Sequence, residues 1–201
     1  MKHETIDTIS RRVFRIYQEI EKQTLRVRRQ TGMVCPDRCG QCCWSRNIEA
    51  TVVEMIPMVS HLLRSGTMPE ILASLDTAGP EDLCVFFRPD MAHREQGFCS
   101  EYRYRPLVCR LFGFSARRGK DDQVSAQVCR VIKQADPGAC ARFDALCRSG
   151  VLPPMRAWFQ RIASMDPARG YRLMPINQAL KECIDLFFWR KPRFFRPPKA
   201  S

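Results

Sequence analysis

Near the N-terminus, apolar residues recur at spacings of three and four positions along an otherwise polar stretch. They are Ile6, Ile9, Val13, Ile16 and Ile20. This period predicts an amphipathic helix from Thr5 to about Arg29, because residues three and four apart share one face of a helix. Charged side chains fall mostly on the other faces, and Gly32 is placed to end the helix.

Two further helices are indicated by the residues at their ends. Thr51 and Glu54 have the spacing of a capping box, and Gly66 is placed to end the helix that they begin. Pro57 is expected either to kink this helix or to mark its first turn. The stretch 67–80 repeats the pattern, with a proline near its first turn and a Gly-Pro pair at its end.

The rest of the chain predicts shorter elements and then more helix. Residues 84–87 and 97–99 fit two short strands, and residues 106–112 fit one or two helical turns. Residues 113–122 are expected to form an exposed loop. Three further helices are predicted near residues 137–148, 154–165 and 175–189.

The composition and the first residues of the chain indicate the cellular compartment. Apolar residues make up 45% of the 201 residues, enough for a core, and no apolar stretch is long enough to cross a bilayer. The first residues lack the apolar segment of a secretory signal, so we expect a cytoplasmic protein in a reducing environment. Disulfides are rare there, and the eleven cysteines need another explanation.

Four of the cysteines lie within nine residues of a polar turn. They are Cys35, Cys39, Cys42 and Cys43. Gly40 lets its neighbours converge in a tight turn, since glycine accepts a positive φ. Thiolates at this spacing are typical ligands of Zn²⁺ or of an iron–sulfur cluster. Because adjacent side chains usually diverge, the vicinal pair is expected to point into two neighbouring sites or to contact different atoms of a polynuclear centre.

Four more cysteines lie at predicted strand ends or short turns. They are Cys84, Cys99, Cys109 and Cys129. With the first four they total eight, the number that two four-thiolate sites require, but on their positions alone they fit ligands and buried thiols equally well. Cys140, Cys147 and Cys183 lie on predicted helices, and we expect them to be core thiols.

The order of these residues resembles a known family. The chain reads Cys35-x3-Cys39-Gly40-x-Cys42-Cys43, then Thr51-x2-Glu54, then Cys84-x-Phe86, then Cys99-x2-Tyr102-x2-Arg105-Pro106-x2-Cys109-Arg110. Over roughly residues 33–130, this pattern resembles the YkgJ-type CxxCxxCC cysteine-cluster family, which is described as zinc- or iron-chelating. It is also similar to the cysteine-rich region of flagellin lysine N-methylases.

The resemblance implies ligand roles for seven cysteines. They are Cys35, Cys39, Cys42, Cys43, Cys84, Cys99 and Cys109. It supports Cys129 less, because that residue lies beyond the best-matched segment. Arg105 and Arg110 are expected beside the metal, either donating hydrogen bonds to its sulfur ligands or forming a salt bridge or a backbone clamp, with Tyr102 packed near them. Arg103 departs from the family, which often has an acidic residue there.

These observations predict a metal-binding protein that acts as a redox or metal-chelating module. The vicinal thiols and the methylase resemblance favour an iron–sulfur cluster, [4Fe-4S] above others, over zinc. One alternative is a metal-dependent enzyme resembling the protein-lysine methylases. The sequence shows no nucleophile–base pair, paired carboxylates or glycine-rich cofactor loop, so any catalysis would depend on the metal cluster.

A second alternative is a basic nucleic-acid-binding protein with structural zinc. The net charge is +12, and basic residues gather on the first helix and at the C-terminus, where a nucleic acid, a protein or an acidic surface could bind. The candidate contacts are Arg11, Arg12, Arg15, Arg190, Lys191, Arg193 and Arg196. The competing interpretation is a solvated helix face and a disordered tail.

Together the patterns predict a mostly α fold with a small β element, in which an irregular, metal-organised cysteine-rich core is flanked by helices. Four segments are expected. They are an N-terminal basic amphipathic helix over 1–32, a cysteine-cluster metal-binding domain over 33–135, C-terminal helices packing on it over 136–190, and a basic proline-rich tail over 191–201.

Overall fold

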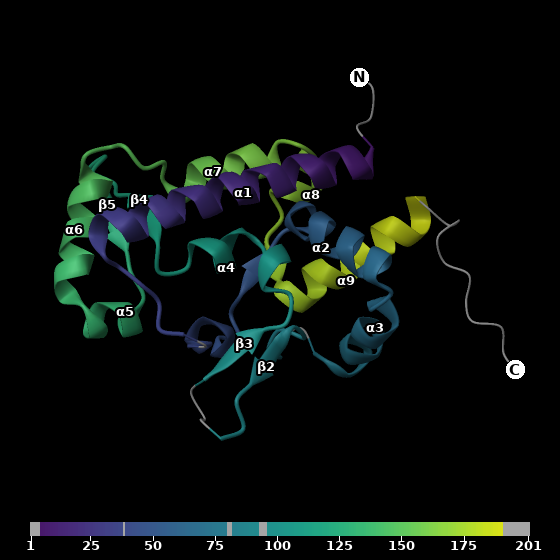
Figure 1. The fold of residues 1–201 in the computed structure, drawn as a ribbon. Coiled ribbons are helices and arrows are strands. Elements are labelled where there is room, and N and C mark those ends of the chain that lie inside the picture. The colour runs from purple at the N-terminus through teal and green to yellow at the C-terminus, as the bar shows by residue number, and fades with distance from the viewer. Residues whose placement is uncertain (1–4, 38, 80–81, 93–95, 191–201) are drawn as a thin grey trace, which may run out of the picture.

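The computed structural model describes residues 5–37, 39–79, 82–92 and 96–190 (Figure 1). Within these residues the fold is mostly α with small two-stranded sheets, as the sequence pattern predicted. No helix in this described part is long and apolar enough to span a membrane. The division of the chain into four segments stays a prediction.

The longest helix, α1 (Ile6–Thr31), runs along one edge of the molecule and packs against α2 (Val52–Ser65) (Figure 1). Thr5 caps it, with the hydroxyl accepting a hydrogen bond from the Thr8 backbone N–H at 3.3 Å. Gly32 ends it at a φ of 75°, as predicted. The predicted apolar stripe is buried, and Tyr17 and Val27 are buried with it.

The helix α2 lies at the centre of the main core. Thr51 and Glu54 form both halves of the predicted capping box, and Gly66 ends the helix. Pro57 lies inside α2, so the alternative in which it marks the first turn is wrong. Residues 52–60 are all buried, because neighbouring helices cover α2 on several sides.

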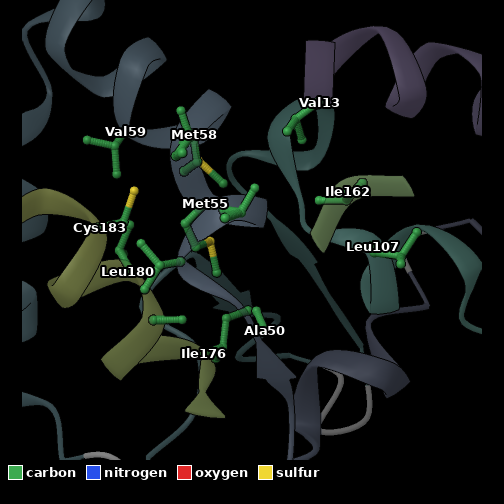
Figure 2. Close-up of a cluster of buried hydrophobic side chains, with 14 of the residues drawn as sticks. Val13, Ala50, Met55, Met58, Val59, Leu107, Ile162, Ile176, Leu180 and Cys183 are labelled. Carbon is green, nitrogen blue, oxygen red and sulfur yellow. The ribbon is translucent and has the colours of Figure 1, made fainter. Parts of the chain in front are cut away.

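The C-terminal helix α9 (Ile176–Arg190) packs on the other side of α2 (Figure 1). Figure 2 shows Leu180 and Cys183 of α9 beside Val59 and Met55 of α2. Cys183 is fully buried there, which confirms its prediction as a core thiol. The short strands β1 (Glu49–Ala50) and β6 (Met174–Pro175) pair antiparallel and lead into α2 and α9.

Three smaller helices complete this core. They are α3 (Met68–Thr77), α7 (Met155–Ala163) and α8 (Pro167–Gly170). Of these, α8 was not predicted, and α3 and α7 lie within their predicted ranges. Trp158 and Ile162 bring α7 into contact with the main cluster.

A second hydrophobic cluster lies at the far end of α1. It is built by α5 (Arg130–Ala135), α6 (Pro137–Arg148) and the antiparallel pair β4 (Ser115–Arg118) and β5 (Val124–Gln127). The predicted loop over 113–122 is therefore wrong in part, because Ala116 is buried and the Ala126 backbone N–H donates to the Asp144 carboxylate at 2.9 Å. Cys147 is fully buried as predicted, whereas Cys140 is only partly buried.

The segment that carries most of the remaining cysteines is irregular. It contains the 3-10 turns Gln41–Trp44 (η1) and Tyr102–Tyr104 (η2), the strands β2 (Phe87–Pro89) and β3 (Gly97–Cys99), and α4 (Leu107–Leu111). The strand predicted at 84–87 begins only at Phe87, as β2, and it pairs with β3, which matches the predicted strand at 97–99. Residues 84–86 are not strand, because the backbone around them is held by Asn177 of α9. Its amide oxygen accepts from Val85 N at 3.1 Å, and its nitrogen donates to Leu83 O at 3.2 Å.

Candidate metal centre

The first cysteines lie on a turn fixed at both ends. Met33, directly after α1, is fully buried in the second cluster, and the chain then turns back on itself. The Cys39 N–H donates to Pro36 O at 3.3 Å, and the Cys43 N–H donates to Gly40 O at 2.8 Å. These two bonds fold Cys35 and Cys39 back toward η1, which carries the vicinal pair.

Gly40 is required for two separate reasons. Its φ is 60°, in the left-handed region that favours glycine. A Cβ at Gly40 would also lie 2.7 Å from the Gly97 carbonyl oxygen, because the turn rests directly on β3. The cysteine turn and the strand that ends at Cys99 are therefore in backbone contact.

Seven of the eight predicted ligands line one cavity of about 470 Å³. They are Cys35, Cys39, Cys42, Cys43, Cys84, Cys99 and Cys109. They come from the cysteine turn, from the two sides of the β2–β3 pair and from α4. Aromatic side chains, among them Phe86, Phe87 and Phe98, line the same cavity. Three segments far apart in the sequence thus bring their thiols to one place.

Cys129 lies apart from this cavity. Its sulfur caps α5 by accepting a hydrogen bond from the Ile132 N–H at 3.4 Å, and it lines a neighbouring cavity beside Gly113. It is still near enough to Cys35 to help raise the pKa of that thiol. The structure therefore places Cys129 beside the Cys35 end of the cysteine-lined cavity but not on its wall.

The thiols surround a space and do not yet converge on a point. In the parts of the chain that the structure describes, no three Cys, His, Asp or Glu side chains already form a site for one metal ion. Cys42 and Cys43 both line this cavity from the 3-10 turn η1, and a hydrogen bond links their side chains.

Burial makes most of these thiols poor acids. It raises the pKa of Cys84 and of Cys35 to about 12, and it raises the pKa of Cys109 well above its ordinary value. A hydrogen bond from Cys43 lowers the pKa of Cys42 to about 7 and raises the pKa of Cys43. Gathering several thiolates here therefore requires a compensating cation, since like charges in a buried site oppose ionisation.

Arg105 supplies one positive charge at the cavity wall. Its guanidinium carbon lies 3.5 Å from the ring centroid of Tyr102, and both residues line the cavity. Its Nε is buried without a hydrogen-bond partner. A buried donor without an acceptor is costly, and its presence in a residue of the cavity wall favours an anionic acceptor nearby. The donor set and this orphaned nitrogen both fit a thiolate-bound metal group.

Arg110 acts on the backbone instead. It is buried, donating Nε to the carbonyl of Arg105 at 2.8 Å and a second nitrogen to the carbonyl of Arg103. Its guanidinium carbon also lies 4.2 Å from the ring centroid of Tyr17. Of the roles expected for Arg110, the backbone clamp is observed, together with an ion pair to Glu21 at 3.8 Å, and the clamp fixes the turn that presents Arg105.

Two positioning residues were not identified as such from the sequence. Glu54 is 2% exposed, and its Oε2 accepts a hydrogen bond from the Leu107 N–H at 2.9 Å, two residues before Cys109. Burial outweighs this bond and raises the pKa of Glu54 to about 7. Asn177 similarly holds the backbone on both sides of Cys84. The Thr51-x2-Glu54 pattern was a signal for the first, but the sequence held none for the second.

Comparison with known families agrees with this geometry. Residues 34–130 match the CxxCxxCC family model, which is described as a putative zinc- or iron-chelating domain. The chain is therefore similar to the CxxCxxCC family over these residues, which make up just under half of its length. The CxxCxxCC segment contains all eight predicted ligands and leaves out Cys140, Cys147 and Cys183. Neither the curated proteins nor the solved structures gave a match.

The CxxCxxCC segment does not stand alone in the fold. Its α2 is covered by α1 and α9, which both lie outside the matched residues. The side chain of Asn177, also outside it, holds the backbone around Cys84. Helices outside the family segment therefore help to build the cysteine-lined cavity.

Proposed function

We propose that the protein binds metal in the cysteine-lined cavity and acts there as a redox or metal-chelating module. One observation carries the proposal: a single cavity is lined by seven thiols and by Arg105, whose Nε is buried without a hydrogen-bond partner. Thiolates are the ligands that zinc and iron–sulfur centres prefer. The proposed ligands are Cys35, Cys39, Cys42, Cys43, Cys84, Cys99 and Cys109, with Cys129 next to them.

An iron–sulfur cluster, [4Fe-4S] above others, is favoured over zinc. A structural zinc ion is closed by four ligands at about 2.0–2.3 Å, which needs little space. The cavity here measures about 470 Å³ and carries seven thiols, which suits a polynuclear group better. A buried guanidinium donor also fits, because hydrogen bonds to cluster sulfurs are a common way to tune such groups.

When bound, a cluster would supply one-electron transfer, and the chain's own residues would set its surroundings. Arg105 lowers the pKa of Cys42 through its positive charge and would donate a hydrogen bond to the bound group. Arg110 holds the turn that carries Arg105, and Glu54 holds the first turn of α4 that carries Cys109. Aromatic residues on the cavity wall, such as Phe86, restrict water.

Anaerobic purification tests the proposal directly. Brown protein that contains iron and acid-labile sulfide would support the cluster, and colourless protein with stoichiometric zinc would support the alternative metal. Protein that holds neither metal would overturn metal binding. Cys99→Ser is expected to lower the metal content, whereas Cys147→Ser, at a buried thiol away from the cavity, is the matched control and should leave it unchanged.

The methylase-like alternative rests on the resemblance alone. It predicts that the metal-loaded protein binds S-adenosylmethionine, which calorimetry can measure; absence of binding removes it. For the setting, we propose a cytoplasmic protein. All eleven cysteines are free thiols in the structure, which is compatible with a reducing compartment.

A further inference from the structure

The exposed side of α1 carries a continuous row of cations. We call it the α1 basic stripe, and it consists of Arg11, Arg15, Lys22, Arg26 and Arg29. At 3.6 residues per turn, these five positions fall within about 60° of one another around the helix axis. With a rise of 1.5 Å per residue, the stripe is about 27 Å long.

These cations are not neutralised by the fold. Among the residues that the structure describes, none of the five has an ion pair or a side-chain hydrogen bond. Two acidic residues of α1 flank the stripe and face other helices instead. Glu19 pairs with Arg161 of α7 at 2.7 Å, and Glu21 lies 3.8 Å from Arg110 of α4. Arg12, which the sequence had suggested as a contact, is engaged in another interaction.

The shape of the stripe favours one kind of polyanion. The apolar stripe of α1 is buried in the core, so the helix has no apolar face to place into a lipid surface. The exposed positions between Arg11 and Gln30 include no aromatic residue on which single-stranded bases could stack. What remains is a straight row of cations that matches the closely spaced phosphates of a duplex.

We propose that the α1 basic stripe binds double-stranded nucleic acid through its phosphates, without reading the bases. An open groove lined by Lys22, Leu25, Arg26, Arg29 and Gln30 lies within the stripe and gives a phosphate backbone a place to rest. This binding is independent of the metal proposed for the cysteine-lined cavity, because none of the five stripe residues lines that cavity.

The full chain, as purified, is titrated into a fluorescein-labelled 20-base-pair duplex of mixed sequence, with anisotropy read from 50 to 200 mM salt. Each phosphate contact contributes about 0.9 to the slope of log K against log salt concentration. The variant carrying Arg15→Gln, Lys22→Gln, Arg26→Gln and Arg29→Gln is expected to reduce the magnitude of that slope by about 3 to 4.

The matched control removes cations elsewhere on the surface. Arg64 of α2 and Lys181 of α9 are both exposed. For the variant carrying Arg64→Gln and Lys181→Gln, the slope of log K against log salt concentration should differ from that of the parent by no more than about 0.5. Circular dichroism and metal content must match the parent for both variants. The proposal is overturned if duplex binding is absent at 50 mM salt, or if the stripe variant keeps the parent slope. It is also overturned if the four substitutions weaken binding to anionic lipid vesicles but not binding to the duplex.

Discussion

The carboxylate of Glu54 accepts a hydrogen bond from the backbone N–H of Leu107 at 2.9 Å, which joins the start of α2 to the start of α4. The other oxygen of Glu54 accepts from the Thr51 N–H and hydroxyl. One buried carboxylate thus closes a capping box and fixes the helix that bears Cys109.

Glu54 should make stability depend on pH near neutrality. Burial raises its pKa in the folded protein to about 7, above the ordinary 4.5, so the folded state holds a proton that the unfolded chain has lost. The free energy of unfolding should therefore fall by about 2 kcal/mol as the pH rises from about 5.5 to 8. In Glu54→Gln this component disappears, although the variant is less stable throughout because the amide cannot satisfy all three donors.

Urea unfolding of both proteins at the two pH values measures this difference. The thiols titrate in both proteins, so their contribution cancels when the two pH dependences are subtracted. Identical pH dependences for parent and variant would show that Glu54 does not titrate in this range.

Gly40→Ala should disrupt the cysteine turn. The left-handed backbone alone costs an alanine about 1–2 kcal/mol, and the new Cβ would clash with the Gly97 backbone at 2.7–2.9 Å. Gly66→Ala is the matched control, since its φ is 77° but no atom lies within 4 Å of the added Cβ. The midpoint temperature of thermal unfolding and the metal content should both fall further for Gly40→Ala than for Gly66→Ala. Equal losses in the two variants would contradict the close approach of Gly40 to the Gly97 backbone.

Arg110→Gln should destabilise the fold through the backbone turn. It removes charged hydrogen bonds to the carbonyls of Arg105 and Arg103, and such bonds contribute about 1.5–3 kcal/mol each. We expect a loss of about 3 kcal/mol or more in unfolding free energy. Arg118→Gln breaks only an exposed pair with Asp122 and should cost less than about 1 kcal/mol. If Arg110→Gln also lowered the free energy of unfolding by less than about 1 kcal/mol, the backbone clamp by Arg110 would be refuted.

Arg105→Gln should instead change the bound metal group while leaving the fold intact. Loss of a partly buried positive charge beside the cavity makes an anionic cluster harder to reduce, so its reduction potential should become more negative. Redox titration of the purified protein measures the shift, and circular dichroism checks the fold. An unchanged potential would mean that the partnerless Nε does not face the bound group.

Local signals in the sequence were sufficient for most helices. Caps and terminal glycines act over a few residues, and Thr5, Gly32 and the Thr51–Glu54 pair did in the structure what their spacing predicted. The presence of several thiols in one cavity also followed from local spacing at the cysteine turn, since four of the seven come from nine residues.

Features that depend on distant partners were not predictable in this way. The strand predicted at 84–87 begins only at Phe87, because Asn177, more than ninety residues later, takes the backbone groups of Leu83 and Val85. The β4–β5 pair was missed because its burial is provided by α6 and Asp144, which lie further along the chain. The sequence left the role of Arg110 open between a sulfur contact, a salt bridge and a backbone clamp, because the choice depends on carbonyls that only the folded turn brings within reach.

The two hydrogen bonds of Asn177 also bear on how small a working unit of this protein can be. Because α9 holds the backbone next to Cys84, a fragment of residues 34–130 would keep every proposed ligand. It would lose the two Asn177 hydrogen bonds that hold the backbone on both sides of Cys84. Helix α9 therefore helps to position the cysteines, and we expect the smallest fragment that binds metal to extend well beyond residue 130.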